Sequence, residues 1–303
     1  MKKKKFILVA VLLLALFVLS GCSKDTTSAL GKNGFKFEDI FVYPMAGLMW
    51  VLSWVSKNIF GIASYGIIII LATIIVRTLA WPIYAKTNDM GLKMQLVGPE
   101  AERIKQKYAE KTDPQSQQRM QIETMQLYKK YGIGLGGCLM PLIQMPIFIG
   151  FYRTISRMPE TLKVENHWLN VFDTTKFLGV DLTLGQQGSS TQKTAVIVLA
   201  ILVGITQVLS LFISQRRQKK LKASQQSTVP AYRRQAAGGT QKQTEMTMNF
   251  VMYGMTLMMV VFVLQSPAGL GVYWLIGNIY STIQSYLGHK NSQKRLIQLR
   301  NTH

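Results

Sequence analysis

One arginine lies inside a long apolar segment, where its charge needs a partner. Arg77 follows an almost continuous run of apolar side chains that starts at Ile67. On insertion scales, a charge in a membrane helix costs about 2.5 to 3.5 kcal/mol when it faces lipid. Two explanations stay open. The side chain extends to nearby lipid headgroups, or it faces water and polar groups inside the protein.

Polar side chains in three other apolar segments favour the second explanation. They recur at helical spacing, and nearly all fall in the same half of their segments. With Thr73, one turn before Arg77, the set comprises Gln144, Gln207, Ser210, Ser214, Trp274, Asn278, Ser281 and Ser285. Hydrogen bonds between helices explain each segment taken singly. Polar groups from four segments at similar depth instead predict a hydrated half-cavity, open to the cytoplasm and to lipid and closed outward by apolar packing.

Such a cavity would suit an acidic guest. A positive charge in a low-dielectric setting attracts carboxylates, and water partway into the bilayer shortens the path over which a polar segment loses its hydration. Flexible methionines in the segment 246–264 serve either varied apolar guests or ordinary packing. They are Met246, Met248, Met252, Met255, Met258 and Met259.

Enzymatic and metal chemistry find no support in the residues. The apolar segments contain no Asp or His, and the chain has no Gly-x-Ser-x-Gly, His-Glu-x-x-His or P-loop motif, so an intramembrane hydrolase is disfavoured. An anion transporter would show an internal repeat, which is absent. Cys22 and Cys138 stand apart from the scattered histidines, so no metal site and no cofactor are predicted.

The composition combines two properties that soluble domains rarely share. Hydrophobic residues make up 48% of the chain, yet the formal net charge is +21. Long apolar runs indicate membrane spans, whereas nucleic-acid binding would need the basic residues gathered on one folded domain. The predicted fold is an all-α, polytopic membrane protein with five transmembrane helices at about residues 61–81, 137–155, 194–213, 246–264 and 269–286.

The first 21 residues form a predicted lipoprotein signal peptide. Four lysines precede an apolar run that ends in Leu19-Ser20-Gly21-Cys22, the pattern of a bacterial lipobox. Cleavage would leave Cys22 as the first residue, carrying diacylglycerol and palmitate on the extracytoplasmic side. The alternative is an uncleaved anchor helix with an incidental cysteine.

Two short stretches lead from Cys22 to the first predicted span. Residues 22–44 are expected to be an extracytoplasmic tether. Residues 45–60, with Trp50 and Trp54, form an amphipathic helix that either lies in the lipid interface or packs in the core.

Basic residues mark the orientation in the plasma membrane. The segments 82–136 and 214–244 hold nine and eight Lys/Arg, and the tail 289–303 holds four. The loop 158–192 holds two lysines against four acids, with Arg153, Arg157 and Lys193 at its edges. The positive-inside rule therefore places the first three segments in the cytoplasm, in agreement with an extracytoplasmic Cys22.

The cytoplasmic segment 82–136 has the pattern of a charged helical hairpin. Met94, Val97, Ala101, Ile104 and Tyr108 follow a three-and-four spacing along one helical face. Thr112-Asp113-Pro114 then predicts a new helix start, with a capping side chain followed by proline at the first helical position. A solvated connector of the same composition is the alternative.

Three motifs together resemble one known family. They are the run from Gly136 to Phe148, Arg77 before Trp81-Pro82, and the run from Pro267 to Trp274 followed by Asn278 and Gln284. In these residues the chain is similar to the YidC/Oxa/Alb membrane protein insertases, in their Gram-positive lipoprotein form. The likeness covers nearly all of the mature chain.

The resemblance implies a function and a site. It implies a non-enzymatic insertase and chaperone for nascent membrane proteins, with a five-helix core at 61–288 and a hydrophilic groove open to cytoplasm and lipid. The groove arginine matches Arg77, and its lining matches Gln144, Gln207 and Trp274. A mobile hairpin at 82–136 would contact clients first, with the Sec translocon, the ribosome and membrane lipids as partners.

The chain departs from the family pattern at two places. Gly134-Leu135 stand where many relatives have Asn-Pro, so the start of the second span is expected to be looser. The basic tail after Leu287 is short, which puts ribosome binding by the tail in doubt.

Overall fold

The computed structural model describes residues 28–32, 37, 39–109, 111, 113–133, 140–186, 188–227 and 239–301. The predicted signal peptide, Cys22 and the beginning of the motif 136–148 lie outside the described residues. Within the described part the architecture is helical, as predicted, with one two-stranded β-hairpin.

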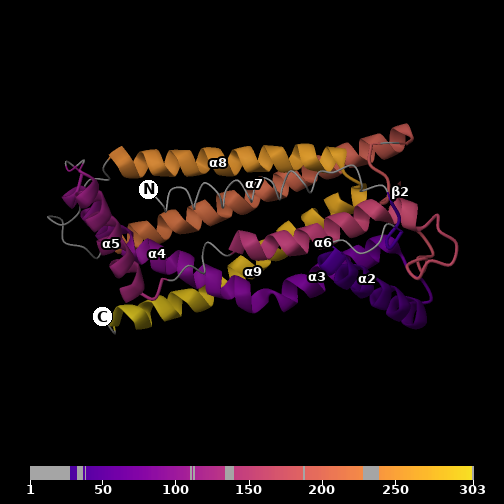
Figure 1. The fold of residues 1–303 in the computed structure, drawn as a ribbon, viewed down its shortest axis with the longest axis horizontal. Helices are drawn as coiled ribbons and strands as arrows, with labels where there is room; N and C mark the ends of the chain where they lie inside the picture. The colour runs from indigo at the N-terminus through magenta and orange to yellow at the C-terminus, as the bar shows by residue number, and fades with distance from the viewer. Residues whose placement is uncertain are drawn as a thin grey trace.

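Most of the helices lie side by side, roughly along the long axis of an elongated bundle (Figure 1). In chain order the helices and strands are α2 (Asp39–Phe60), α3 (Tyr65–Leu79), α4 (Trp81–Lys107), α5 (Pro114–Lys130), α6 (Met140–Thr161), β1 (Lys176–Phe177), β2 (Val180–Asp181), α7 (Ser190–Ser227), α8 (Gly239–Gln265) and α9 (Ala268–Asn301). The α4 and α5 pair forms one end of the bundle, and the β-hairpin lies at the other end (Figure 1).

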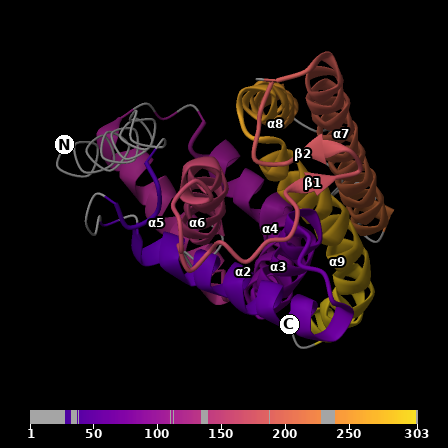
Figure 2. The ribbon, with the colours of Figure 1, turned by 90° about the vertical axis from the view of Figure 1, so that its right-hand side faces the viewer.

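The central pair of the bundle is α3 and α9. They contact each other, while α2 and α6 pack on one side and α7 and α8 on the other. The end-on view in Figure 2 shows this arrangement, with α3 between α2 and α9. Segments about 200 residues apart in the chain, at Thr78 and Tyr280, are joined there by a hydrogen bond of 2.8 Å.

Helix lengths bear on which elements can cross a membrane. Among the described helices, α2 and the Ser190–Arg217 part of α7 are long and apolar enough by length and composition, and Tyr65–Leu79 and Met252–Gln265 are shorter apolar helices. Charges and prolines interrupt α6, and α9 is polar in its second half. Because α2 is also long and apolar enough to cross a membrane, length does not distinguish a membrane-spanning helix from one that lies in the interface. The interfacial position of residues 45–60 therefore stays a prediction.

The chain passes from α3 to α4 almost without interruption. Ala80 has helical φ and ψ of −79° and −4°, and Pro82 lies in the first turn of α4, where a missing backbone N–H costs little. The long helices extend beyond the predicted spans: the 38 residues of α7 make about 57 Å at 1.5 Å per residue, more than the hydrocarbon thickness of about 30 Å.

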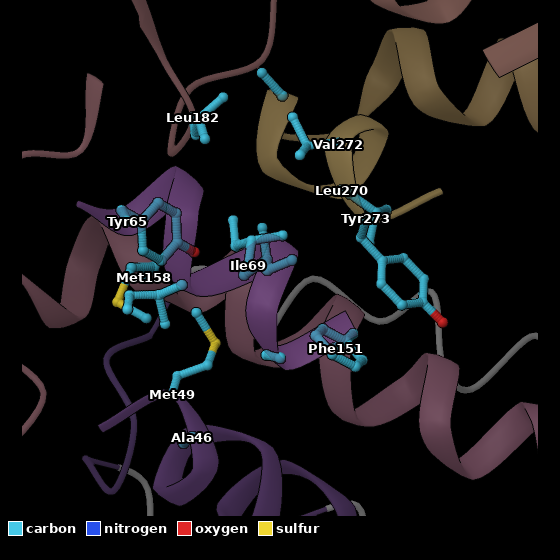
Figure 3. Packing of buried hydrophobic residues seen from close by; sticks show 14 of the residues in the cluster. Ala46, Met49, Tyr65, Ile69, Phe151, Met158, Leu182, Leu270, Val272 and Tyr273 are labelled. Atoms are coloured by element: carbon cyan, nitrogen blue, oxygen red, sulfur yellow. The ribbon is translucent and has the colours of Figure 1, made fainter. Parts of the chain in front are cut away.

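The main apolar core lies at the β-hairpin end of the bundle, since Phe177 and Val180 of the hairpin pack against it. Figure 3 shows the packing of its side chains. The core joins Met49 of α2, Ile69 of α3, Phe151 of α6 and Leu270 of α9, and Leu182 of the α6–α7 connection also belongs to it. These are the halves of the helices that the proposed orientation places outside, so the core closes that end.

The connection between α6 and α7 caps this core. Its β-hairpin turns at Leu178 and Gly179, which both have positive φ, 52° and 81°. The N–H groups of Ala268 and Gly269 donate to the carbonyls of Leu184 and Leu182 at 2.9 and 2.8 Å, which satisfies donors at the start of α9.

A buried ion pair ties α2 to α6. Arg157 Nη1 donates to Asp39 Oδ1 at 3.0 Å, with both side chains almost fully buried. Arg153, one turn earlier, is only 2% exposed. The sequence placed both arginines at the edge of an outer loop, whereas in the structure both lie within α6 and Arg157 pairs with Asp39 of α2.

Candidate functional site

An open cavity lies between α3, α6, α7, α8 and α9, away from the main core. Its volume is about 350 Å³. The residues that line it are Arg77, Gln144, Gln207, Ser210, Leu211, Ile213, Ser214, Arg217, Met259, Trp274, Asn278, Ser281, Thr282 and Ser285. Two of these side chains are cationic and none is acidic, so within the described residues the lining favours anions.

Neutral groups hold Arg77 in place at the end of α3. Its Nη1 donates to Ser281 Oγ at 3.1 Å and to Tyr84 Oη at 3.2 Å. A Cβ added at Gly277 would lie 2.9 Å from Arg77 Nη2, so the absence of a side chain there lets the guanidinium lie against α9. Since these partners carry no charge, the positive charge stays available to a guest.

Two tyrosines connect Arg77 to α6. Tyr84 donates its hydroxyl to Gln144 Oε1 at 2.5 Å, and Gln144 Nε2 donates to Tyr273 Oη at 3.4 Å. This chain of hydrogen bonds fixes the orientation of the Gln144 amide. The polar groups of α3, α4, α6 and α9 therefore form one connected network.

Hydroxyl groups join α7 and α9 along the opposite wall. Ser210 Oγ and Thr282 Oγ1 lie 2.5 Å apart, and Asn278 Nδ2 donates to Thr206 Oγ1 at 3.4 Å. Arg217 Nη1 donates to Ser285 Oγ at 3.3 Å. On α9 the members of these pairs recur at about one helical turn, which keeps the two polar stripes in register.

Aromatic rings close the cavity toward the main core. Trp274 lines the cavity, stacks on Phe148 with ring centroids 5.5 Å apart, and meets Phe262 edge-on, also at 5.5 Å. Tyr152 packs on both phenylalanines. The polar half of the bundle thus ends at a layer of aromatic side chains, followed by the apolar core.

Most of the residues predicted for the site meet in this cavity. Arg77, Gln144, Gln207, Trp274, Asn278 and Ser281 all line it. Thr73 does not. It is fully buried and donates to the carbonyl of Ile69 on its own helix at 2.7 Å.

Three polar members of the site were missed by the sequence: Tyr84, Arg217 and Thr282. Tyr84 and Arg217 both fall in segments assigned to cytoplasmic connections, which is why they were not considered. A signal existed for Arg217, because it continues the helical stripe of Gln207, Ser210 and Ser214 by three residues. Within the described residues no cluster of three His, Cys, Asp or Glu occurs.

The α4–α5 pair carries its own electrostatic contacts. Asp113 caps α5 by accepting the N–H of Ser116 at 2.7 Å, and hydrogen bonding by the Ser116 side chain, followed by this backbone bond, lowers the pKa of the Asp113 carboxyl. Near the tip, Lys107 contacts Glu123 at 2.8 Å, and Tyr108 donates to the same carboxylate at 2.8 Å. These bonds lower the pKa of Glu123, and the bond to Glu123 raises the pKa of Lys107. The helix start predicted at Asp113-Pro114 is confirmed.

The fold and the cavity define a class: a helical membrane protein with a cationic cavity closed at one end. The chain belongs to the family described as 60Kd inner membrane protein, whose model matches residues 54–295. The family predicted from the sequence is therefore confirmed. Insertases of this family are non-enzymatic, so the prediction that the chain is not an enzyme is also confirmed.

Curated relatives match over nearly their full lengths. Membrane protein insertase YidC of Oceanobacillus iheyensis is 31% identical over 95% of this chain and 97% of its own. Membrane protein insertase YidC 2 of Bacillus anthracis is 31% identical over 94% and 93%. Membrane protein insertase MisCA of Bacillus subtilis is 30% identical over 89% and 85%.

Proposed function

We propose that this protein inserts other proteins into the plasma membrane, as the names of its relatives indicate for them. The observation that carries the proposal is the cavity around Arg77. It is cationic, has no acidic lining among the described residues, and is open at one end and bounded by Trp274 toward the main core. A site of this kind offers water and positive charge to a polar segment without forming a pore.

The membrane arrangement we propose follows the charge pattern. Helices α3, α6, α7, α8 and α9 supply the five spans, with the α4–α5 pair and the C-terminus in the cytoplasm. Cys22 carries the lipid on the outer side, the tether that begins there ends at Asp39, where the structure begins α2, and α2 lies at the outer interface. In this orientation the cavity opens as a groove toward the cytoplasm and the main core faces outward.

The first step is capture of a client by the α4–α5 pair. Ile122 and Met125 of α5 are 44% and 50% exposed, which provides apolar contact surface on an otherwise charged hairpin. An apolar client segment can bind there before it reaches the bilayer.

The second step moves the client's polar part into the groove. Arg77 attracts acidic residues of the short segment that must cross, because its hydrogen-bond partners are neutral and the site is partly shielded from bulk water. The hydroxyls of α7 and α9 replace part of the hydration of the segment.

The third step releases the client's apolar part into lipid along α3, α7 and α9. The outer face of α7 is rich in exposed apolar side chains: Ile197, Val198, Ile201, Leu202, Ile205, Val208, Leu209 and Phe212. The free energy comes from burial of the client's apolar segment in lipid. The Sec translocon and the ribosome are proposed partners, the latter through the basic cytoplasmic segments.

The test uses cells depleted of this protein and a small client with a short acidic translocated tail. Wild type, Arg77→Ala and Arg216→Ala are expressed in turn, and protease protection of the tail reports insertion. Arg216 is a matched control because it is exposed, lies over the Phe212 ring at 4.1 Å and does not line the cavity.

We expect wild type and Arg216→Ala to restore insertion and Arg77→Ala to fail with the acidic tail. A neutral-tailed client should lose less in Arg77→Ala. Insertion that proceeds without this protein, in cells and in purified proteoliposomes alike, would overturn the proposal.

A further inference from the structure

The cavity contains a second arginine that the proposed function does not use. Arg217 lines the same space as Arg77 but comes from α7 rather than α3. It belongs to the segment 214–244, whose basic residues indicate a cytoplasmic location by the positive-inside rule. Arg217 lines the cavity, whereas the adjacent Arg216 does not.

Neutral partners hold Arg217 toward α9, as they hold Arg77. Its Nη1 donates to Ser285 Oγ at 3.3 Å, and its Cζ lies 5.4 Å from the centre of the Tyr286 ring. Neither contact neutralises the guanidinium. Among the described side chains no acidic group pairs with either arginine, and two cations in one cavity repel each other, so a carboxylate that binds one of them also lowers the cost of keeping the other there.

Both arginines are held by serines of α9. Ser281 contacts Arg77 and Ser285 contacts Arg217, and these serines are four residues apart on one helical face. Four residues correspond to about 6 Å along the helix. In an extended peptide, side chains on alternate residues point the same way and lie about 6.6 Å apart. Two carboxylates in an Asp-x-Asp arrangement therefore have about the same spacing as the two serines that hold the guanidinium groups.

We propose that Arg217 is a second anion-binding position of the groove, and that it makes the protein selective for clients whose translocated segment carries a pair of acidic residues. This inference rests on the proposed insertase function and names its substrate class. An acidic residue meets Arg217 at the cytoplasmic end of the cavity and Arg77 deeper inside. A paired segment occupies both positions at once, whereas a single acid is held by one.

The adjacent arginine supplies the control. Arg216→Gln and Arg217→Gln remove the same charge from the same part of α7, so their effect on orientation and on general attraction of anions is matched. Only Arg217 lines the cavity, because Arg216 lies over the Phe212 ring instead. Arg217→Lys keeps the positive charge but removes the planar guanidinium, so it distinguishes the effect of the charge from the effect of the guanidinium geometry.

The experiment uses full-length protein in proteoliposomes with three clients, whose tails carry Asp-x-Asp, one Asp or none. The measured quantity is the insertion of the paired client divided by that of the single-acid client. We expect Arg217→Gln to lower this ratio about fivefold, the effect of one partly exposed charge pair, and Arg217→Lys to restore most of it. Arg216→Gln should keep the wild-type ratio.

The outcomes separate the two levels of inference. If wild type inserts none of the clients better than empty liposomes do, the insertase function itself fails. If wild type inserts them and the ratio is the same in Arg217→Gln and Arg216→Gln, the second binding position is wrong while the insertase function stands. Should Arg217→Gln prove misfolded by its thermal unfolding, the uncharged pair Arg217→Met and Arg216→Met decides instead, and equal ratios in these two variants would overturn the inference.

Discussion

Arg77 owes its position to a residue that has no side chain. Gly277 leaves room for the guanidinium beside α9, where an added Cβ would lie 2.9 Å from Nη2. That atom is the far end of a flexible side chain, so it can move away at little cost in stability. The position of the charge and the stability of the fold are thus separable at this site.

Gly277→Ala is expected to impair function without destabilising the protein. Alanine in a helix interior is favoured over glycine by about 0.5 to 1 kcal/mol, so the thermal unfolding temperature should stay equal or rise. Insertion of acidic-tailed clients should fall because Arg77 is displaced. Gly254→Ala on α8, where nothing lies within 4 Å of the added Cβ, is the control. Equal insertion by both variants would show that the displacement of Arg77 has no consequence.

At this scale the sequence predicted the types of residue better than their contacts. Gln207, Trp274, Asn278 and Ser281 were recognisable because polar side chains at helical spacing in apolar segments are costly. Thr73 satisfied the same criterion, yet its hydroxyl bonds its own helix, as threonine commonly does. Spacing alone does not distinguish the two cases.

Packing between α2 and α6 depends on charge as well as apolar contact. Asp39 and Arg157 form their ion pair with side-chain exposures of 3% and 4%. These residues are 118 positions apart in the chain, so no local pattern could have paired them. The sequence consequently placed Arg157 at the edge of the outer loop 158–192.

Asp39→Ala is expected to destabilise the protein by about 3 to 5 kcal/mol, because it removes the ion-pair partner of a buried guanidinium. Thermal unfolding in detergent would measure this loss. Glu160→Ala serves as the control, since the pair of Glu160 with Lys163 is largely exposed and worth about 0 to 1 kcal/mol. Losses of similar size in both variants would mean that the buried pair contributes no more than a surface pair.

The α4–α5 pair is expected to loosen in acid. The folded-state pKa of Glu123 is lowered by its bonds to Lys107 and Tyr108, so its stabilisation is fully present above the pKa of the unfolded carboxyl, about 4.3. It is lost as the pH falls through the lower, folded-state value. Lys107, whose pKa is raised, contributes below its unfolded value of about 10.4 and loses this contribution only at higher pH.

Hydrogen exchange of the full-length protein tests this. Amide protection of residues 97–123, corrected for the intrinsic pH dependence of exchange, should decrease in acid in wild type. Glu123→Gln should be less protected than wild type at neutral pH and equal to it in acid. A constant difference between the two proteins at every pH would contradict the assignment.

The bundle has two dissimilar ends. The cavity occupies the half that contains Arg77, Gln144 and Ser281, and the main core with Ile69, Phe151 and Leu270 occupies the other half. The sequence predicted this division, because polar groups clustered in one half of each apolar segment. It did not predict the aromatic layer between the halves, which brings together Phe148, Phe262 and Trp274 from three helices.

Two barriers in series should keep the protein impermeable. Trp274→Ala is expected to enlarge the cavity and weaken insertion. Proton leakage, measured with a pH-sensitive dye trapped inside liposomes, should nevertheless be as slow with this variant as with wild type, because the main core remains. Phe250→Ala, on the exposed face of α8, is the control for general effects of losing an aromatic ring. Rapid proton leakage through Trp274→Ala would show that the aromatic layer alone forms the seal.

The closed outer end also concentrates the transmembrane voltage. Water and ions that fill the cavity bring the cytoplasmic potential as far as Trp274, so in the proposed orientation the voltage drops almost entirely across the main core. A client carboxylate beside Arg77 therefore has the whole field still ahead of it, over a short distance. With the cytoplasm negative, each carboxylate that crosses gains about 2.3 kcal/mol per 100 mV. A pair gains about twice that, so a paired tail would couple insertion more steeply to the energised state of the cell.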